Sequence, residues 1–306
     1  MSAAIEQKVP EESPLVTFFH ISRFHIIVIA AAASLTFSWV FTGEHNLAVP
    51  ALVAFDWFLV NILNRVVDLR EDRLNNAVGT GFIDQNAKAI TIGSWAALFL
   101  SFPLLHIFFP ALLGWRILFQ LIGIAYNYKI IPWPGGFTRF KEIYFFKNFA
   151  SGVLFLLSGL VYPIVDAGAA ELISPTRLAL FAVFYLAMDF TYEIFYDLRD
   201  LDGDKAEGVP TFPVVHGKTG AHRLVIALLF VAAAALLGGY GLGALVFADV
   251  VMVAAVFQQG AYFKWKVTNG LNQDDCVFVT YLGAAQLVSY NLWIWAGLPL
   301  DLTTVI

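Results

Sequence analysis

Long apolar segments separated by short polar connections run through most of the chain. A helix that crosses a bilayer needs about 20 consecutive, mostly apolar residues. By this criterion we expect about nine transmembrane helices, at residues 22–42, 48–68, 90–110, 112–130, 146–165, 177–197, 223–241, 243–262 and 277–297. The pattern therefore predicts an all-α, polytopic membrane helical bundle.

Composition strengthens this interpretation. Apolar residues make up 59% of the 306 residues and charged residues only 13%, whereas soluble domains carry about 25% charged residues. We expect a single domain over residues 1–306, in which the polar and acidic residues 1–14 form a flexible N-terminal tail. The single cysteine, Cys276, excludes an intramolecular disulfide.

The distribution of lysine and arginine predicts the orientation of the bundle. With nine spans, all 18 of these residues except Arg116 and Arg177 fall in one set of connections. Because cytoplasmic loops carry the excess of positive charge, we expect the N-terminus in the cytoplasm and the C-terminus outside. The connections that follow the second and sixth spans then lie on the cytoplasmic side.

The connection after the second span carries Asn64, Asp68 and Asp72 at four-residue spacing. On a helix each such step advances by only about 40°, so the three side chains share one face. Oxygen ligands of this kind suit Mg²⁺, which commonly binds through one or two carboxylates plus substrate phosphates. A solvated helix end with mixed charges is the alternative explanation for this segment.

A second acidic segment follows about 130 residues later, around the end of the sixth span. If the helix of the sixth span continues through this segment, five acids lie within an arc of about 80° around its axis. They are Asp189, Glu193, Asp197, Asp200 and Asp204. Acidic residues within a membrane segment are costly and usually functional, and Asp189 and Glu193 should lie deepest. A turn at Asp202 explains that residue, but it does not explain acids that recur along one face.

Basic and aromatic side chains flank both acidic segments. The basic candidates for neutralising a departing diphosphate are Arg65, Arg70, Arg73, Lys141, Lys147 and Arg199, with Asn148 beside Lys147. The aromatic candidates for lining an apolar cavity, where their faces can stabilise positive charge, are Tyr126, Tyr128, Tyr192 and Tyr196. The positive-inside bias explains each cation equally well, and anchoring at the membrane interface explains each tyrosine.

At these residues the chain resembles the UbiA superfamily of intramembrane prenyltransferases. Residues 64–72 are similar to the family's N-x3-D-x3-D motif, and residues 196–217 to its second D-x3-D motif with the following G-x-x-T-x-P…G tail. Weaker similarities lie at residues 22–24, which include Arg23, and at 79–83 and 126–128. Many members carry Arg-Pro shortly after the first motif, and this chain departs from that pattern at residues 75–80.

The resemblance implies a bundle with a central cavity open to lipid, where Mg²⁺ ions hold an isoprenyl diphosphate between the two motifs. Carried over to this sequence, one metal is held by Asn64, Asp68 and Asp72, and the other by Asp200 and Asp204, with Asp197 assisting. The four motif aspartates are then the catalytic residues. We expect diphosphate contacts from Asn64, Arg65, Lys141, Lys147, Asn148 and Arg199. We expect the substrate cavity to include Arg23, Tyr126, Tyr128, Asp189, Tyr192, Glu193 and Tyr196.

The leading hypothesis is Mg²⁺-dependent transfer of an isoprenyl group from a prenyl diphosphate to a lipophilic, aromatic or quinone-type acceptor, with release of diphosphate. Glu193 or Asp189 would orient the acceptor or take its proton. The alternatives are a UbiA-type terpene cyclase that needs no acceptor, and a divalent-cation transporter or metal-binding scaffold. The expected partners are the donor, the acceptor and the bilayer, with no nucleic acid. We expect an integral membrane protein whose active site faces the cytoplasm. The expected membrane is a bacterial or archaeal inner membrane or an organellar membrane.

Overall fold

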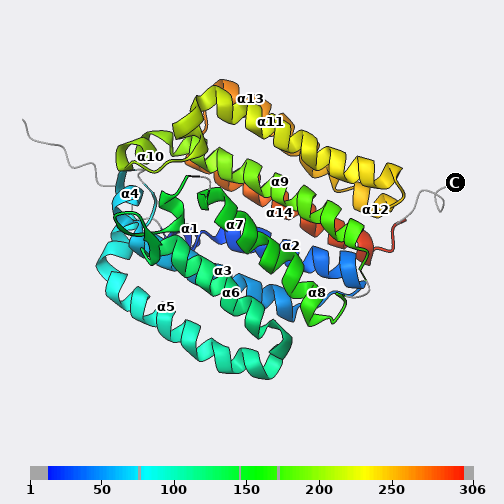
Figure 1. Cartoon of the computed structure of the whole chain (residues 1–306), viewed down its shortest axis with the longest axis horizontal. Helices are drawn as coiled ribbons and strands as arrows, with labels where there is room; N and C mark the ends of the chain where they lie inside the picture. The colour runs from blue at the N-terminus through cyan, green and yellow to red at the C-terminus, as the bar shows by residue number, and fades with distance from the viewer. Residues whose placement is uncertain (1–12, 75–76, 145, 171–172, 300–306) are drawn as a thin grey trace, which may run out of the picture.

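The apolar segments fold into long helices that lie side by side along roughly one direction (Figure 1). This computed structural model describes residues 13–74, 77–144, 146–170 and 173–299, so most of the tail expected at residues 1–14 lies outside the described residues. Within these ranges, seven segments are long and apolar enough to cross a membrane. They are α2 (Phe24–Thr42), α3 (Ala48–Val67), α5 (Thr80–Phe108), the run α7 (Phe146–Leu156), η3 (Leu157–Val161) and α8 (Tyr162–Asp166), α9 (Pro175–Arg199), α11 (Phe212–Gly241) and α14 (Gln273–Trp295).

The two other expected spans correspond to shorter helices. α6 (Leu113–Asn127), which follows the turn η1 (Pro110–Leu112), has 15 residues, and α13 (Val253–Asn269) has 17. Both fall short of the usual length of a span. The stretch expected as one span at 243–262 is also divided, because α12 (Phe247–Val250) ends before α13 begins. The membrane-helix fold is therefore confirmed, whereas the number nine stays a prediction.

Two apolar cores hold the bundle together, and α2 contributes to both. The N-terminal half of α2 packs through Ile27 and Ala30 into a core with α3 and α6. Its C-terminal half packs through Phe37 and Phe41 into a larger core with α9, α11, α13 and α14. α2 thus contacts both halves of the molecule. The polar side chains described below lie between these two cores.

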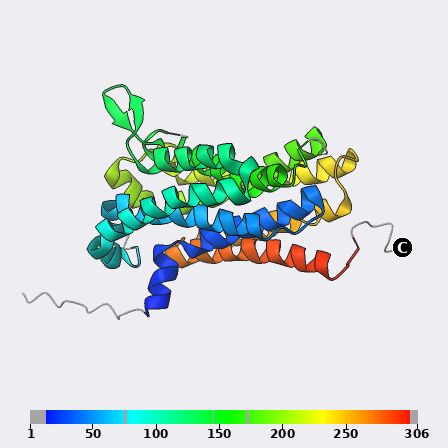
Figure 2. The same ribbon diagram turned by 90° about the horizontal axis from the view of Figure 1, so that it is seen from below.

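The short elements gather at one end of the bundle. α1 (Pro14–Ile21), α4 (Leu69–Leu74) and α10 (Leu201–Glu207) lie at the end opposite α8 and α12 (Figure 1). A small antiparallel hairpin, β1 (Ile131–Trp133) and β2 (Gly136–Thr138), projects beyond the helices at the same end (Figure 2). Both acidic segments are in this region, so the sequence prediction that they share one side of the bundle agrees with the arrangement of the helices.

The two basic residues assigned to the opposite side each pair with a buried acid. Arg116 lies 2.8 Å from Asp56, and both side chains are completely buried. Arg177 lies 2.8 Å from Asp249, whose carboxylate also accepts a hydrogen bond from the amide of Val246. Both apparent exceptions to the positive-inside bias are therefore charge-neutral pairs. This pairing also argues against a polar path for ions through that half of the bundle.

The orientation can be tested with single cysteines at opposite ends of α9. Asp202 and Ser174 are exposed, whereas the native Cys276 is fully buried and should react little. In spheroplasts that express the protein, a membrane-impermeant maleimide should label Ser174→Cys but not Asp202→Cys, and permeabilisation should expose both. The opposite labelling pattern would overturn the expectation of a cytoplasmic N-terminus.

Candidate active site

The two acidic motifs have the same backbone geometry. α3 ends at Asp68 (φ −94°, ψ 18°) and α4 follows, while α9 ends at Asp200 (φ −88°, ψ 8°) and α10 follows. In each, the amide of the second aspartate donates to the carbonyl of the first at 2.9 Å, from Asp72 to Asp68 and from Asp204 to Asp200. Each motif is therefore a bent helix end, here called an aspartate turn, rather than the single continuous helix expected from the sequence.

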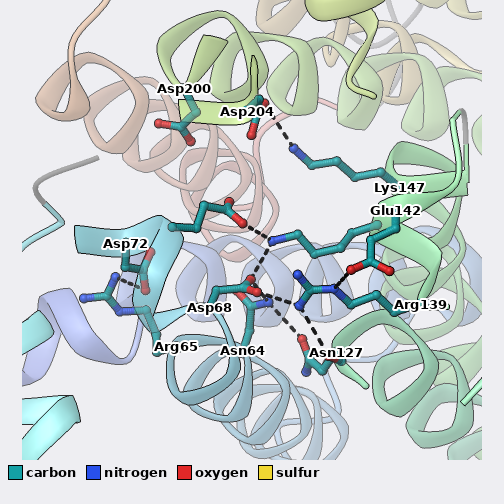
Figure 3. A network of polar contacts seen from close by, with 12 residues as sticks. Asn64, Arg65, Asp68, Asp72, Asn127, Arg139, Glu142, Lys147, Asp200 and Asp204 are labelled. Atoms are coloured by element: carbon teal, nitrogen blue, oxygen red, sulfur yellow. Dashed lines mark hydrogen bonds and ion pairs between the residues drawn. The ribbon is translucent and has the colours of Figure 1, made fainter. Parts of the chain in front are cut away.

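Asp68 is the centre of the first aspartate turn. Its carboxylate accepts hydrogen bonds from Asn64 Nδ2, Arg139 Nη1 and Lys141 Nζ, each at 2.7 Å (Figure 3). Asn64 also donates to the side chain of Asn127 at 2.9 Å. Burial raises the pKa of Asp68, but the two cations outweigh burial and hold that pKa below its usual value. Asp68 is therefore a fixed negative charge.

The second aspartate of the same turn has a different partner. Asp72 lies 2.7 Å from Arg65 and 4.0 Å from Arg23. Burial raises the pKa of Asp72, and the two arginines only partly offset this effect. Arg23 itself adopts φ +50° at the start of α2, a left-handed conformation that is uncommon for residues other than glycine. Arg23 also lines the cavity described below.

Lys141 and Arg139 reach Asp68 from the connection between α6 and α7. Arg139 directly precedes the turn η2 (Phe140–Glu142), which follows the hairpin, and Lys141 is the middle residue of this turn. Glu142 holds this segment in place, because its carboxylate accepts from Thr138 Oγ1 at 3.0 Å and Arg139 Nε at 3.2 Å. Lys141 also donates to Glu71 at 2.5 Å. The hairpin connection thus delivers two positive charges to the first aspartate turn.

The second aspartate turn receives its positive charge from α7. Lys147 Nζ donates to Asp197 at 2.6 Å and lies 3.9 Å from Asp204, and Figure 3 shows its side chain extending toward Asp204. Asn148 donates to the other oxygen of Asp197 at 3.1 Å. Arg199 pairs with Asp200 at 2.5 Å. All three of the acids expected to bind metal here therefore lie close to a cationic side chain.

Asp204 nevertheless has unused binding capacity. Its side chain is completely buried, and neither carboxylate oxygen has a hydrogen-bond partner within the described residues. Burial raises its pKa to about 6, although Lys147 opposes the shift. A buried carboxylate without hydrogen bonds is costly, and a bound divalent cation would supply the missing interaction. The residues of this turn therefore fit a metal ion.

The metal ligands expected from the two motifs are not close enough together in this structure to bind a metal ion as a group. Among the described residues, no three His, Cys, Asp or Glu side chains lie close enough together to hold a metal ion. The carboxylates are instead separated by the cations that pair with them, chiefly Lys141, Arg65 and Lys147. Binding of two metals as expected from the sequence would require some of these ion pairs to open.

A cavity of about 430 Å³ extends from the aspartate turns into the bundle. From the motif segments it is lined by Asn64, Arg65, Asp68, Asp72, Asp197, Arg199 and Asp200, and farther along α9 by Tyr196, Glu193, Tyr192, Asp189 and Tyr185. Its apolar walls come from α2, α7, α9, α13 and α14. This volume falls within the usual range for a ligand pocket, and the arrangement joins a charged mouth to an apolar interior.

Most of the residues predicted from the sequence line this cavity, with five exceptions. Arg70 and Arg73 are exposed and pair with Glu207 and Asp84 instead. Asn148 and Asp204 lie beside it, in contact with or close to Asp197 and Lys147. Tyr128 is not among the lining residues and packs against Trp95, with ring centroids 6.0 Å apart. Sequence reasoning assigned the Tyr126–Tyr128 pair to the cavity together, but only Tyr126 lines it.

Three functional candidates were missed by the sequence analysis. Arg139 and Asn127 complete the contacts around the first aspartate turn, and His25 lines the cavity with its ring stacked on Tyr196 at 6.2 Å. Arg139 had a usable signal, since it stands two residues before Lys141 in the same basic connection. Asn127 also had a signal, because it lies within the weaker family similarity at residues 126–128, whereas no local pattern marks His25 within its helix.

Comparison with curated proteins finds partial matches. Over 101 residues, 30% of this chain, it is 37% identical to a digeranylgeranylglyceryl phosphate synthase of Haloquadratum walsbyi. Over 201 residues, 65% of the chain, it is 26% identical to a somaliensene A/B synthase of Streptomyces somaliensis. The matched segments span 35% and 56% of these relatives, so neither similarity extends over a whole protein.

Solved structures with the same fold match nearly the whole chain. A UbiA homologue from Archaeoglobus fulgidus bound to GPP and Mg²⁺ gives a TM-score of 0.68 over 90% of this chain and 98% of that one, at 14% identity. A UbiA homologue from Aeropyrum pernix K1 gives 0.60 over 89% and 98%, at 16% identity. The model of the UbiA prenyltransferase family matches residues 23–291. With both aspartate turns inside the matched region, the chain belongs to the UbiA prenyltransferase family.

Proposed function

We propose that this protein transfers an isoprenyl group from a prenyl diphosphate to a lipophilic acceptor within the membrane, in a Mg²⁺-dependent reaction that releases diphosphate. The observation that carries the proposal is the pair of aspartate turns at the mouth of an apolar cavity. Structural neighbours are described as bound to GPP or DMAPP together with Mg²⁺. A relative named digeranylgeranylglyceryl phosphate synthase is consistent with an isoprenoid substrate.

The metal ligands proposed here are Asn64, Asp68 and Asp72 on one turn and Asp200 and Asp204 on the other, with Asp197 beside the second. These residues would hold Mg²⁺, which would supply electrostatic stabilisation to the departing diphosphate. Within this set, both oxygens of Asp204 and one oxygen of Asp72 have no hydrogen-bond partner among the described residues.

The surrounding cations act on the same leaving group. Arg65, Lys141 and Lys147 each pair with an aspartate of a turn in this structure. Positively charged side chains positioned where negative charge develops lower the barrier to its formation. Lys141 and Lys147 come from the connection between α6 and α7 and from the start of α7, so they approach the two turns from neighbouring parts of the chain.

The interior of the cavity favours a cationic prenyl intermediate. Phe37, Phe155 and Phe184 line its walls, and Tyr192 and Tyr126 add further π-faces. Aromatic faces stabilise positive charge, and an apolar enclosure excludes the water that would otherwise capture an allylic cation. The cavity thus supports both ionisation of the donor at the mouth and reaction of the cation farther in.

Purified protein incubated with labelled geranyl, farnesyl or geranylgeranyl diphosphate tests the proposal. We expect Mg²⁺-dependent release of diphosphate and a prenylated product that forms only when a lipophilic acceptor is present. Asp68→Asn and Asp200→Asn should each remove this activity while the variants still elute as folded, monodisperse protein. Near-normal activity in either variant would contradict the assignment of the aspartate turns.

Cyclisation of the donor without an acceptor is the second candidate. It is favoured by the aromatic walls of the cavity and by the match to the somaliensene A/B synthase over 65% of the chain. The same assay separates the two, because a hydrocarbon or alcohol formed from the donor alone would indicate cyclisation, and a product that requires the acceptor would indicate transfer.

A further inference from the structure

Polar side chains continue along one face of α9 far beyond the aspartate turns. Glu193, Tyr192, Asp189 and Tyr185 all line the cavity. They stand four, five, eight and twelve residues before Asp197 in the helix, so they follow the same side of α9 toward the middle of the membrane. Ionisable groups at this depth are expensive and point to function.

Neighbouring helices leave room for these polar groups through glycines. A Cβ atom added at Gly152 of α7 would lie 3.3 Å from Asp189 Oδ2, and one at Gly283 of α14 would lie within contact distance of the Tyr192 hydroxyl. A Cβ atom at Gly159 would lie 2.8 Å from the hydroxyl of Tyr185. Larger residues at Gly159 and Gly283 would first meet the two hydroxyls, whereas at Gly152 they would first meet Phe190 and Leu186. This stretch of α9 therefore packs closely against all three glycines.

Two polar atoms in this recess have no partner. Asp189 is 7% exposed, and its Oδ2 has no hydrogen bond within the described part of the chain. The hydroxyl of Tyr185 is also without a partner there. Glu193 differs, because Ser151 donates to it at 2.8 Å. Buried polar atoms are normally satisfied, so the two unpaired groups indicate a place for a polar part of a ligand.

The charge of the recess restricts that ligand. The basic residues that line the cavity come from the region of the turns and the N-terminal end of α2, for example Arg23, Lys141 and Lys147. The deeper lining residues of the other helices are apolar, and they include Ile29, Phe37, Phe155, Ala255 and Leu287. Lys147 and Arg23 act on Glu193 near the mouth, whereas no cation of the described residues acts on Asp189. An anionic group bound beside Asp189 would therefore lack a cation to pair with, and an unpaired buried charge is strongly disfavoured.

We propose that the recess formed by Tyr185, Asp189, Tyr192 and Glu193 binds the head group of the acceptor, and that it takes an uncharged alcohol or phenol rather than a carboxylate or phosphate. This inference rests on the proposed prenyl transfer. Asp189 Oδ2 accepts a hydrogen bond from the acceptor hydroxyl. As the donor C–O bond breaks, diphosphate leaves with the electron pair, an electron pair of the acceptor forms the new bond, and the proton released by the acceptor passes to Asp189.

Matched acceptors that differ only in charge test the inference. Full-length protein in detergent is supplied with labelled geranylgeranyl diphosphate, Mg²⁺ and either 4-methylphenol or 4-hydroxybenzoate, and in a second pair either a dialkylglycerol or its phosphate. In each pair that yields product, kcat/KM for the neutral acceptor should exceed that for the anionic one by at least about tenfold. The selectivity ratio is independent of the fraction of active protein.

Variants then connect the selectivity to the recess. Asp189→Asn keeps the size of the side chain and should bring the ratio to within about threefold of unity, with a lower kcat for the neutral acceptor. Tyr185→Phe removes only the hydroxyl and should raise KM for that acceptor about three- to tenfold. A purely structural role for Asp189 would reduce activity toward both acceptors equally and leave the ratio unchanged.

The outcomes distinguish this inference from the proposed function. Faster reaction with the anionic acceptor, an unchanged ratio in Asp189→Asn, or product formed without acceptor would overturn the inference while Mg²⁺-dependent diphosphate release still supported the family chemistry. Absence of diphosphate release under every condition would overturn the proposed function and this inference with it.

Discussion

Asp204→Asn should abolish turnover and leave the protein at least as resistant to heat as the wild type. The carboxylate is completely buried and its oxygens form no hydrogen bonds within the described residues. An ionised group in that position destabilises the fold, so its neutral isostere removes a cost. The same substitution removes a charged ligand from the proposed metal site, where several kcal/mol of transition-state stabilisation is typical. We expect turnover to fall at least about 100-fold.

Asp202→Asn is the matched control for this substitution. Asp202 lies on the same short helix α10, but its side chain is exposed. We expect its turnover and its melting temperature to stay close to wild type. Both variants would be compared by diphosphate release and by thermal unfolding in the same detergent. A marked drop in the melting temperature of Asp204→Asn would show that the carboxylate has a structural role that outweighs the cost of its burial.

The fold was largely predictable because membrane spans are encoded by long apolar segments. The positions of α2, α3, α9 and α14 agree with the expected spans to within a few residues. The polar start of α5 was not predicted, since the helix begins at Thr80 and passes through Asp84 and Lys88 before the apolar stretch. A hydropathy pattern reports where a helix is apolar and carries no information on how far it continues beyond the bilayer.

The site was predictable where its residues repeat along one helix face. The four-residue spacing identified Asp68, Asp72, Asp200 and Asp204, and the structure brings them into one network of polar residues (Figure 3). The ion pairs that separate these acids depend on tertiary contacts, such as Arg139 reaching Asp68 across 71 positions of sequence. Periodicity predicts which side chains share a face, but it does not predict which cations fold back onto them.

In the deep recess, too, the acids on α9 could be predicted from the sequence, but the residues that face them could not. Asp189 and Glu193 were identified as deep acids from their place in the sixth span, and both line the cavity. The glycines that face this stretch of α9 lie on α7, on the π-helical turn η3 and on α14. Since these glycines are distant in sequence, only the structure shows that this stretch of α9 packs against them and lines the cavity.

Asp56→Ala is expected to produce the largest loss of stability among the buried residues outside the cavity. Asp56 accepts from Arg116 Nε at 2.8 Å and from Gln120 at 2.8 Å, and both charged side chains are fully buried between α3 and α6. Without the carboxylate, Arg116 keeps Ser101 as a partner and lies over the ring of Phe102. Removing one member of a buried pair typically costs about 3–5 kcal/mol.

Removing both charges should recover most of that stability, because an apolar replacement for a buried ion pair is often neutral or stabilising. Thermal unfolding in detergent should therefore rank wild type and Asp56→Leu/Arg116→Met well above Asp56→Ala. The pair does not line the cavity, so turnover per folded molecule should change little in the double variant. Two results would show that Asp56 and Arg116 do not form a stabilising pair: a melting temperature of Asp56→Ala equal to that of the wild type, or a melting temperature of the double variant as low as that of Asp56→Ala. Loss of turnover in a stable double variant would instead place the pair in the reaction, and would reopen the possibility of a polar path through this half of the membrane.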